Sequence, residues 1–382
     1  MILDREFPPD IRVENEIDAL ADAGHEVHIA CYTQKGNPAF EQTGRVTIHR
    51  KSISRFIYKS SVASLTFPCY FRFWSKFLRQ ILRTYHFDAL HVHDLPLVAV
   101  GARLKRYFNL KLIADLHENW PAFLDISKHA RTLAGRLLSP VFLWRKYERK
   151  ILHEPDAILV VVKEAKERLA GLGLDPGKIR IVSNTINLAE VNLSPAVVSH
   201  QHQILYYAGG INYHRGLQHV IQAMYKSENP HLIFWILGEG SYKNHLMELV
   251  QQLSLTDRVI FQGYQPFARV MEMLSESDFA LIPHLKTEHT DSTIPHKLFQ
   301  YMYAQIPVIA SDCLPIKRIL EETGAGITYP SHDPGQLAAI FNHLDSVDKV
   351  FMGSQGRSWV EKVYNWQHDA RVLKDMYNTL QD

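Results

Sequence analysis

The sequence predicts an α/β protein built from two Rossmann-like domains, each with a parallel sheet covered by helices. Three observations lead to this prediction. The chain has 382 residues, more than twice the usual length of one domain. Apolar, β-rich runs alternate with segments of helical period over nearly the whole chain. A stretch between Glu190 and Gln203 has no sustained period and divides these runs into two series.

The expected strands are short apolar runs, each followed by a segment with helical periodicity. In the first series they occupy 25–32, 89–93, 111–117, 157–162 and 178–184. In the second series they occupy 204–209, 231–238, 258–263, 279–283 and 307–311. Runs that are apolar throughout are typical of parallel strands buried on both faces.

The segments between the strands carry apolar residues at the spacing of one helix face. In the first half this stripe is formed by Val13, Ile17, Leu20 and Ala21, ahead of Gly24. In the second half it is formed by Leu217, Val220, Ile221 and Met224. We expect these stripes to pack on the sheets.

The domain boundaries follow from the same pattern. We expect a first domain over 1–190, a linker over 191–203, a second domain over 204–364 and a final helical segment over 365–382. The beginning is irregular, because only Met1 to Asp4 precede the loop REFPPDIR, whereas a strand usually has about five or six residues. Two interpretations remain open: an unusually short first strand, or a start that lies upstream.

Composition excludes several classes of protein. With 46% hydrophobic residues, 21% charged residues and a net charge of +2, the chain is neither disordered nor fibrous. Its cysteines, Cys31, Cys69 and Cys313, are far apart, so neither a disulfide framework nor a zinc knuckle is expected. We find no signal peptide and no run of membrane-spanning length, and we expect a cytoplasmic protein.

An ordered set of motifs makes the prediction more specific. The second half contains YYAGGINYHRGLQHVIQAM, ILGEGSYKNHL, TIPHKLFQYMYAQIPVIASD and GAGITY, and the first half contains AGHEVHIACY, FDALHVHD, LIADLHE and KIRIVSNTIN. Over nearly its whole length the chain resembles the family-4 glycosyltransferases of the GT-B fold. The resemblance implies two domains facing each other across a cleft, with the acceptor side at 1–190, the nucleotide-sugar side at 204–364, and the final helix crossing back to the first domain.

A diphosphate leaving group needs positive charge and backbone N–H donors at the carboxyl ends of parallel strands. Arg215 and Gly216 follow such a strand, and a basic residue at a helix N-terminus opposes the helix dipole, which favours a functional role over a merely solvated arginine. Gly209, together with Gly238, Glu239 and Gly240, follows two strands in the same way, although a GxG after a strand is also an ordinary tight turn. The resemblance implies donor binding for all of these.

The next loop departs from the family. Where the family has Glu, seven residues and a second Glu for the ribose hydroxyls, this chain has Ser292 and Gln300. Gln300 keeps hydrogen-bonding capacity, whereas Ser292 is too short to replace a carboxylate without help from Asp291 or Glu288. Gly210 stands where many relatives have arginine. The predicted donor site also includes Gly210, Thr293 and Ile294, with Lys297 as an added cation near the phosphates; a lysine on a solvated face explains Lys297 equally well.

In the first half, His117 follows a strand and matches the family's histidine near the reacting sugar. We therefore predict catalytic roles for His117, Arg215 and Lys297. The predicted acceptor contacts are Glu118 and Arg12, the latter in a loop that replaces the family's glycine-rich turn.

The run His91, Val92, His93 and Asp94 raises the question of a metal site. We expect none, because its spacing alternates faces within and just beyond a strand, no third group of ligands is evident, and the resembling family needs no metal here.

From Arg45 to Arg83 the chain has nine basic residues, many aromatic residues and no Asp or Glu. This mixture suits the headgroup zone of an anionic membrane, and a partly buried helix with solvated basic side chains explains it equally well. Nucleic acid is not expected, because no recognised binding module accompanies the charge.

The resemblance implies a retaining, hexosyl-type glycosyltransferase that uses a nucleotide-sugar donor, with no metal and no further cofactor. The acceptor is expected to be a lipid-linked or envelope glycan, and the protein to lie at the inner face of the cell membrane. Two alternatives stay open: a catalytically silent nucleotide-binding or scaffold protein of the same fold, and a nucleotide-sugar 2-epimerase.

Overall fold

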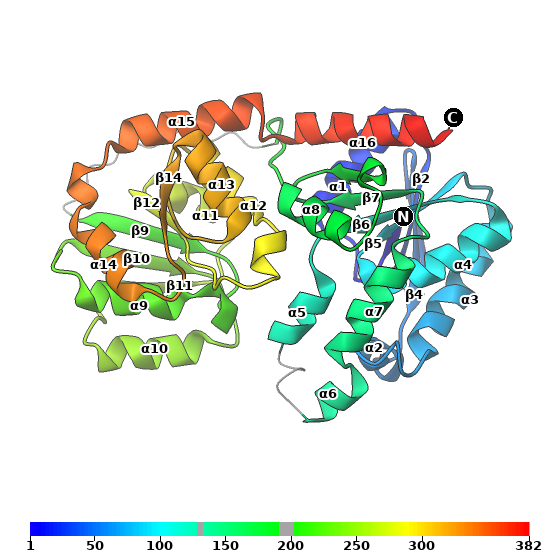
Figure 1. The fold of residues 1–382 in the computed structure, drawn as a ribbon, viewed down its shortest axis with the longest axis horizontal. Helices are drawn as coiled ribbons and strands as arrows, with labels where there is room; N and C mark the ends of the chain where they lie inside the picture. The colour runs from blue at the N-terminus through cyan, green and yellow to red at the C-terminus, as the bar shows by residue number, and fades with distance from the viewer. Residues whose placement is uncertain (128–132, 191–201, 382) are drawn as a thin grey trace. The chain divides into compact units, whose positions relative to one another are not determined.

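The computed structural model describes residues 1–127, 133–190 and 202–381 (Figure 1). The chain divides into two compact units, one formed by 1–184 with 368–382 and the other by 185–367. The predicted linker, 191–203, lies outside the described residues except for its last two. Each unit contains one sheet.

The first unit is built on an eight-stranded sheet in the order β3-β4-β2-β1-β5-β6-β7-β8. All neighbouring strands are parallel except β3 and β4, which are antiparallel. The strands are β1 (Ile2–Leu3), β2 (Val27–Thr33), β3 (Phe40–Thr43), β4 (Val46–Ser52), β5 (Ala89–His93), β6 (Lys111–Leu116), β7 (Ala157–Val160) and β8 (Ile179–Ile181).

The helices of this unit connect the strands and cover the sheet. They are α1 (Ile11–Asp22), α2 (Arg55–Ser60), α3 (Cys69–Thr84), α4 (Val98–Phe108), α5 (Trp120–Ile126), α6 (Leu133–Leu138), α7 (Val141–Ile151), α8 (Lys163–Gly171) and α16 (Trp366–Gln381). From His368 onward, α16 belongs to this unit. Its Tyr377 hydroxyl lies 2.9 Å from Nδ1 of His91 on β5.

Helix α1 shows how local sequence sets the start of an element. The Asp10 side chain accepts a hydrogen bond from the backbone N–H of Val13, and the Asp10 N–H donates to Glu14 in return. The predicted apolar stripe then turns inward, with Val13, Ile17 and Leu20 at most 3% exposed. Short as it is, β1 pairs with both β2 and β5 at the centre of the sheet.

The second unit has a six-stranded parallel sheet in the order β11-β10-β9-β12-β13-β14. Its strands are β9 (Gln203–Ala208), β10 (Leu232–Leu237), β11 (Val259–Gly263), β12 (Phe279–Ile282), β13 (Val308–Ser311) and β14 (Gly326–Tyr329). Its helices are α9 (Leu217–Lys226), α10 (Lys243–Gln252), α11 (Phe267–Ser275), α12 (His296–Tyr303), α13 (Leu314–Thr323), α14 (Pro334–Asn342) and α15 (Lys349–Lys362).

The strands predicted from the apolar runs are confirmed in both units, and the neighbouring strands among them are parallel. The prediction missed the hairpin of β3 and β4, because every residue of β3 is exposed and an edge strand needs no apolar pattern. No described helix combines the length and hydropathy needed to cross a bilayer.

Candidate functional site

The two loops after β9 and β10 pack directly on each other at the carboxyl end of the second sheet. The backbone N–H of Ile211 donates to the carbonyl of Glu239 at 2.9 Å. A Cβ on Gly238 would lie 2.1 Å from the carbonyl oxygen of Gly209, and one on Gly240 would lie 2.0 Å from that of Ile211. These glycines are therefore required by the packing of two backbones, whether or not a ligand also approaches them.

Arg215 ends a short 3₁₀ turn, Tyr213–Arg215, directly before α9. Gly216 between them has φ 71°, and a Cβ there would lie 1.7 Å from the carbonyl oxygen of Pro283. The Arg215 Nη1 atom lies 2.9 Å from Nε2 of His284. Because a guanidinium only donates, that imidazole nitrogen accepts the bond and carries no proton.

Lys297, on the first turn of α12, turns its ammonium group toward the same loops. Its Nζ atom lies 4.0 Å from the centre of the Tyr207 ring, and a Cβ on Gly209 would come within 2.7 Å of it. Burial, with the nearby charge of Arg215, holds the pKa of Lys297 well below its usual value.

Within the described residues, no ion pair joins Arg215 or Lys297 to an acidic side chain. Burial, with the charges of Arg215 and Lys297, also holds the pKa of His284 well below its usual range. The geometry thus concentrates positive charge at the carboxyl end of the sheet, and an anion placed there would stabilise it.

Two polar residues of the loop between β12 and α12 form hydrogen bonds within the second unit, and Gln300 lies on the helix that follows. The Ser292 hydroxyl donates to the backbone carbonyl of Glu288 at 2.7 Å. The Oδ1 atom of Asp291 accepts from the Lys286 ammonium at 3.0 Å and from the first backbone N–H of α13 at 2.8 Å. The side chain of Gln300 forms no hydrogen bond within the described residues.

The other predicted donor residues lie nearby in sequence or on the paired loops. Ile294 is 1% exposed and packs in the core, while Thr293 is half-buried. The Glu239 carboxylate lies 2.7 Å from the Lys243 ammonium, at the solvent. Gly210 is exposed, and its carbonyl accepts from the Tyr207 hydroxyl at 2.9 Å.

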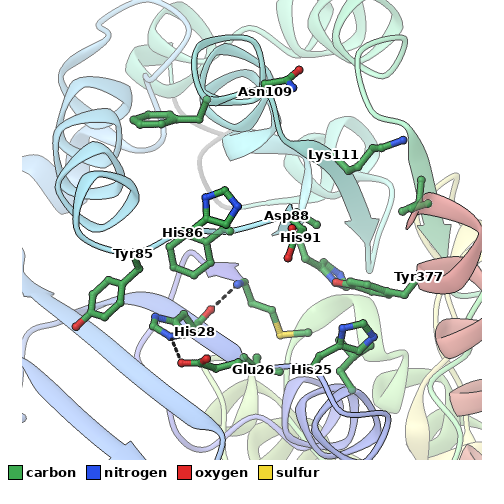
Figure 2. Close-up of a pocket in the computed structure, with 17 residues that line it drawn as sticks. His25, Glu26, His28, Tyr85, His86, Asp88, His91, Asn109, Lys111 and Tyr377 are labelled. Atoms are coloured by element: carbon green, nitrogen blue, oxygen red, sulfur yellow. Dashed lines mark hydrogen bonds and ion pairs between the residues drawn. The ribbon is translucent and has the colours of Figure 1, made fainter. Parts of the chain in front are cut away.

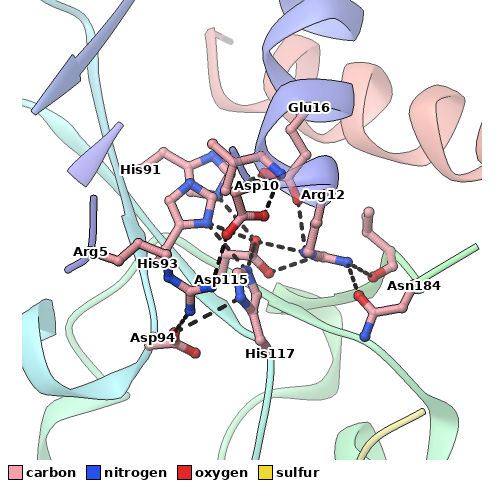
Figure 3. Close-up of polar contacts among 12 residues, drawn as sticks. Arg5, Asp10, Arg12, Glu16, His91, His93, Asp94, Asp115, His117 and Asn184 are labelled. Atoms are coloured by element: carbon pink, nitrogen blue, oxygen red, sulfur yellow. Dashed lines mark hydrogen bonds and ion pairs between the residues drawn. The ribbon is translucent and has the colours of Figure 1, made fainter. Parts of the chain in front are cut away.

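In the first unit, polar side chains gather where β1, β5 and β6 end (Figure 3). The His117 Nε2 atom lies 2.9 Å from a carboxylate oxygen of Asp115, and Nδ1 lies 3.9 Å from Asp94. Arg5 reaches Asp94 at 3.5 Å and Asp10 at 2.8 Å. Because these strands are parallel neighbours, their carboxyl ends bring residues far apart in sequence to one edge.

Arg12, predicted to contact the acceptor, lies beneath this edge and is 4% exposed. Its guanidinium donates to both Asp115 oxygens, at 2.9 and 3.3 Å, and to the carbonyl of Val182 and the side chain of Asn184. These bonds join α1 to β6 and to the segment after β8. The predicted acceptor contact of Arg12 therefore competes with a structural role, and Glu118, half-buried after β6, is the more accessible candidate.

His91 and His93 lie on one face of β5, contrary to the expectation that the spacing of this run alternates faces. Residues two apart on a strand share a face, and the two imidazoles stack with centroids 4.6 Å apart. Glu16 and Asp115 join them, so the four residues place ligand atoms within 4.8 Å of one another. However, Arg12 lies 3.0 Å from Glu16 and 2.9 Å from Asp115, and it already supplies positive charge to both carboxylates. The donor set fits a divalent ion only where that guanidinium is displaced.

The surroundings shift the pKa values of Glu16 and Asp115 in opposite directions. Burial, with the charge of Asp115, raises the pKa of Glu16 well above its usual value. Burial opposes ionisation of Asp115 too, but Arg12 and His117 hold its pKa well below the usual range. For His117, burial lowers the pKa, and the charges of Asp115 and Asp94 outweigh it and raise the value. The surroundings therefore make Glu16 the weaker acid and Asp115 the stronger one, and Arg12 and His117 are the groups that stabilise the ionised form of Asp115.

A cavity of about 930 Å³ lies at the amino ends of the strands of this sheet (Figure 2). Its lining includes Val27, Ala89 and Lys111, the first residues of β2, β5 and β6. It thus opens at the amino ends of the strands, whereas the predicted site residues follow the carboxyl ends.

Three residues that the structure brings to these sites had no predicted role there, and Asp94 was considered only as a possible metal ligand. His284 follows the predicted strand 279–283, Asp94 follows 89–93, and Asp115 lies within 111–117. The signal for His284 and Asp94 was their position after a strand. For Asp115 the local signal was a charged residue in an apolar run, which is rarely buried without a partner.

Family comparisons cover most of the chain. Residues 11–190 match the family model described as Glycosyltransferase Family 4, and residues 194–347 match that of Glycosyl transferases group 1. Together the two matches span both units.

Individual relatives are distant and similar in length. An uncharacterized glycosyltransferase of Methanocaldococcus jannaschii is 21% identical, covering 97% of this chain and 96% of its own. The phosphatidyl-myo-inositol mannosyltransferase of Mycolicibacterium smegmatis is 23% identical, covering 95% and 88%.

Two solved structures share the fold. The sucrose-phosphate synthase of Thermosynechococcus elongatus has a TM-score of 0.78 at 20% identity, covering 97% of this chain and 93% of its own. The Anabaena protein HepE in complex with UDP-glucose has a TM-score of 0.69 at 12% identity, covering 100% and 98%. At these identities the likeness establishes the GT-B fold, as the sequence predicts.

Proposed function

Because this chain belongs to the glycosyltransferases, with a family 4 domain followed by a group 1 domain, we propose that it moves a sugar from a nucleotide-sugar donor to a hydroxyl acceptor. The observation that carries the proposal is the pair Arg215 and Lys297, two cations at the carboxyl end of a parallel sheet that form no ion pair with a described acidic residue. A diphosphate is the ligand that such a site suits, because it supplies the missing negative charge.

Uridine diphosphate is our first choice of nucleotide. The Anabaena protein of the same fold binds UDP-glucose. Gln300 supports a ribose contact, since its side-chain amide has both donor and acceptor atoms and no partner within the described residues. We propose a hexose as the transferred sugar.

Transfer breaks the bond between the anomeric carbon and the diphosphate oxygen and forms a new bond from that carbon to the acceptor oxygen. Arg215 and Lys297 stabilise the charge that develops on the departing diphosphate. The acceptor proton passes to a donor phosphate oxygen on the same face, which leads to retention of configuration and needs no metal. His117, with its raised pKa, donates a hydrogen bond that orients the sugar or the acceptor.

For the acceptor we propose a lipid-linked or envelope glycan, with the enzyme in the cytoplasm at the inner face of the membrane. The Mycolicibacterium relative supports this choice, because its name gives a phosphatidyl-inositol acceptor. The basic residues of the first unit give independent support, since an anionic surface would attract them.

The test is nucleotide release from a panel of nucleotide sugars, beginning with UDP-glucose, with and without a membrane extract. Acceptor-dependent release of the nucleoside diphosphate is the expected result. Arg215→Ala serves as the impaired variant, and Arg269→Ala, which removes an exposed arginine from α11, is the matched control. Absence of release with every donor would overturn the proposal.

One observation favours a second candidate, a catalytically silent protein. Where the resembling family has a carboxylate, this chain has Ser292, whose hydroxyl donates to the backbone carbonyl of Glu288 in its own loop. Such a protein would bind nucleotide without turnover. The same panel separates these outcomes, and it also separates the epimerase, which would return an isomerised nucleotide sugar without an acceptor.

A further inference from the structure

Several large apolar side chains of the first unit remain exposed although they belong to elements distant in sequence. The exposed fractions are 72% for Phe56, 53% for Phe67, 78% for Leu137, 43% for Leu138 and 66% for Phe142. We call this set the apolar tip. Exposed apolar residues are common singly, but a cluster of them indicates an interaction surface.

Hydrogen bonds hold the parts of the tip together. The Thr66 hydroxyl, beside Phe67, donates to the backbone carbonyl of Leu138 at 3.1 Å. From α2 the chain runs directly into the turn that carries Phe67, whose N–H donates to Ala63. Figure 1 accordingly draws α2, α6 and the beginning of α7 at one end of this unit.

A cationic face continues from the tip along α7. Phe142 is followed at helical spacing by exposed residues of one charge, which are Arg145, Lys146, Arg149 and Lys150. The carboxylate of this helix, Glu148, is 4% exposed and binds both terminal nitrogens of Arg168 at 2.8 and 2.9 Å. The solvent-facing side of α7 therefore combines an aromatic ring with four cations.

The part of the first unit formed by α2 and α3 also presents exposed basic residues. Arg55 and Lys59 on α2 are exposed, as are Arg72 and Lys76 on α3, and no Asp or Glu occurs between Arg45 and Arg83. No exposed carboxylate in these segments would repel an anionic partner.

The surface differs from the one expected from sequence. Tyr70, Trp74 and Phe77 of α3 are at most 6% exposed and pack in the core, and the Arg50 guanidinium donates to the carbonyl of Phe7. The acid-free stretch, Arg45 to Arg83, thus supplies cations and two exposed phenylalanines. The remaining apolar residues of the tip come from α6 and α7.

We propose that the apolar tip inserts among the headgroups of an anionic bilayer while the cationic face of α7 contacts lipid phosphates. Aromatic and aliphatic side chains ringed by Lys and Arg suit this interface, where the side chains reach the acyl boundary and the cations stay with the phosphates. This inference deepens the proposed function and rests on it for the lipid-linked acceptor.

Two variants separate the contributions of charge and of apolar burial to vesicle binding. Binding is measured by sedimentation with vesicles of phosphatidylcholine and 30% phosphatidylglycerol. Lys146→Gln/Arg149→Gln/Lys150→Gln should weaken binding about a hundredfold at low salt, since each cation near such a surface contributes about 1 kcal/mol. Leu137→Ser/Phe142→Ser should remove the salt-resistant remainder, at least tenfold, because screening does not affect apolar burial. All five residues are exposed, so folding should be preserved.

The matched controls lie in the second unit. Val350→Ser/Phe351→Ser removes two exposed apolar residues of α15, and Lys226→Gln/Lys317→Gln/Lys362→Gln removes three exposed lysines. Both should sediment like the parent. The proposal fails if the parent does not bind, binds pure phosphatidylcholine equally well, or is unaffected by the tip variants. It also fails if the Leu137→Ser/Phe142→Ser variant instead dissociates a dimer in analytical ultracentrifugation.

UDP binding and nucleotide-sugar turnover in solution, measured on the same proteins, distinguish the two proposals. Turnover without vesicle binding would reject the membrane surface and keep the transferase. Vesicle binding without nucleotide binding would keep the membrane surface and reject the transferase.

Discussion

Nη1 of Arg215 lies 2.9 Å from Nε2 of His284, so a neutral imidazole acts as the hydrogen-bond acceptor that orients an arginine without neutralising it. A carboxylate in the same place would orient Arg215 equally well but would cancel the charge that a diphosphate needs. The arrangement leaves the guanidinium available to an anionic ligand.

Arg215→Ala should lower turnover by about two to three powers of ten, the scale for losing one preorganised group that stabilises developing charge. Arg215→Lys should recover part of this loss, because it restores the charge but not the planar fork. Steady-state kinetics with the best donor of the panel provide the measurement. Unchanged turnover in the alanine variant would remove Arg215 from the diphosphate site.

Lys297→Met should stabilise the free protein at neutral pH by about 1 kcal/mol, or about 2–4 °C in Tm. The folded pKa of Lys297 is lowered, so below its unfolded value the unfolded chain binds a proton that the folded chain resists. The stabilisation should therefore shrink as the pH rises toward the ordinary lysine value near 10.4. Thermal melts at pH 7 and pH 9.5 test this.

Lys317→Met, at an exposed lysine, is the control for those melts and should show no such pH dependence. The same Lys297→Met protein should bind UDP more weakly, because it has lost a cation. Equal stability and equal nucleotide affinity in parent and variant would mean that Lys297 is an ordinary solvated lysine.

Gln300→Leu should weaken nucleotide binding by about 1–3 kcal/mol, since ribose hydroxyls buried against leucine lose their partners. Gln300→Glu should retain or improve affinity, because a carboxylate accepts hydrogen bonds from both hydroxyls. Calorimetric titration with UDP measures both. If the leucine variant binds UDP as tightly as the parent, the ribose lies elsewhere.

Arg12→Met should destabilise the first unit by about 3–5 kcal/mol, because it leaves Asp115 buried without its main cation. Arg12→Lys should cost less, keeping charge but losing the bonds to Val182 and Asn184. Urea denaturation followed by tryptophan fluorescence gives the values. A stable Arg12→Met protein with a raised KM for acceptor would instead favour the acceptor contact predicted from sequence.

Much of the fold and part of the site could be predicted from sequence. The apolar runs identified the parallel strands in both units, and residues placed just after those strands, such as His117 and Arg215, lie where parallel sheets collect functional groups. The hairpin of β3 and β4 escaped because exposed edge residues follow no apolar pattern. His284 was missed because its role depends on Arg215, which is 69 residues away.

The sequence by itself determined most of the elements with a buried face, because periodicity of apolar residues is a local property that one strand or helix satisfies alone. Only the tertiary structure decided which polar residues are paired and which aromatic residues are exposed. Arg12 meets Asp115 across 103 residues, and Trp74 is buried while Phe56 is exposed within one acid-free stretch. Burial and pairing are set by what packs against each side chain, and a linear pattern carries no information about that partner.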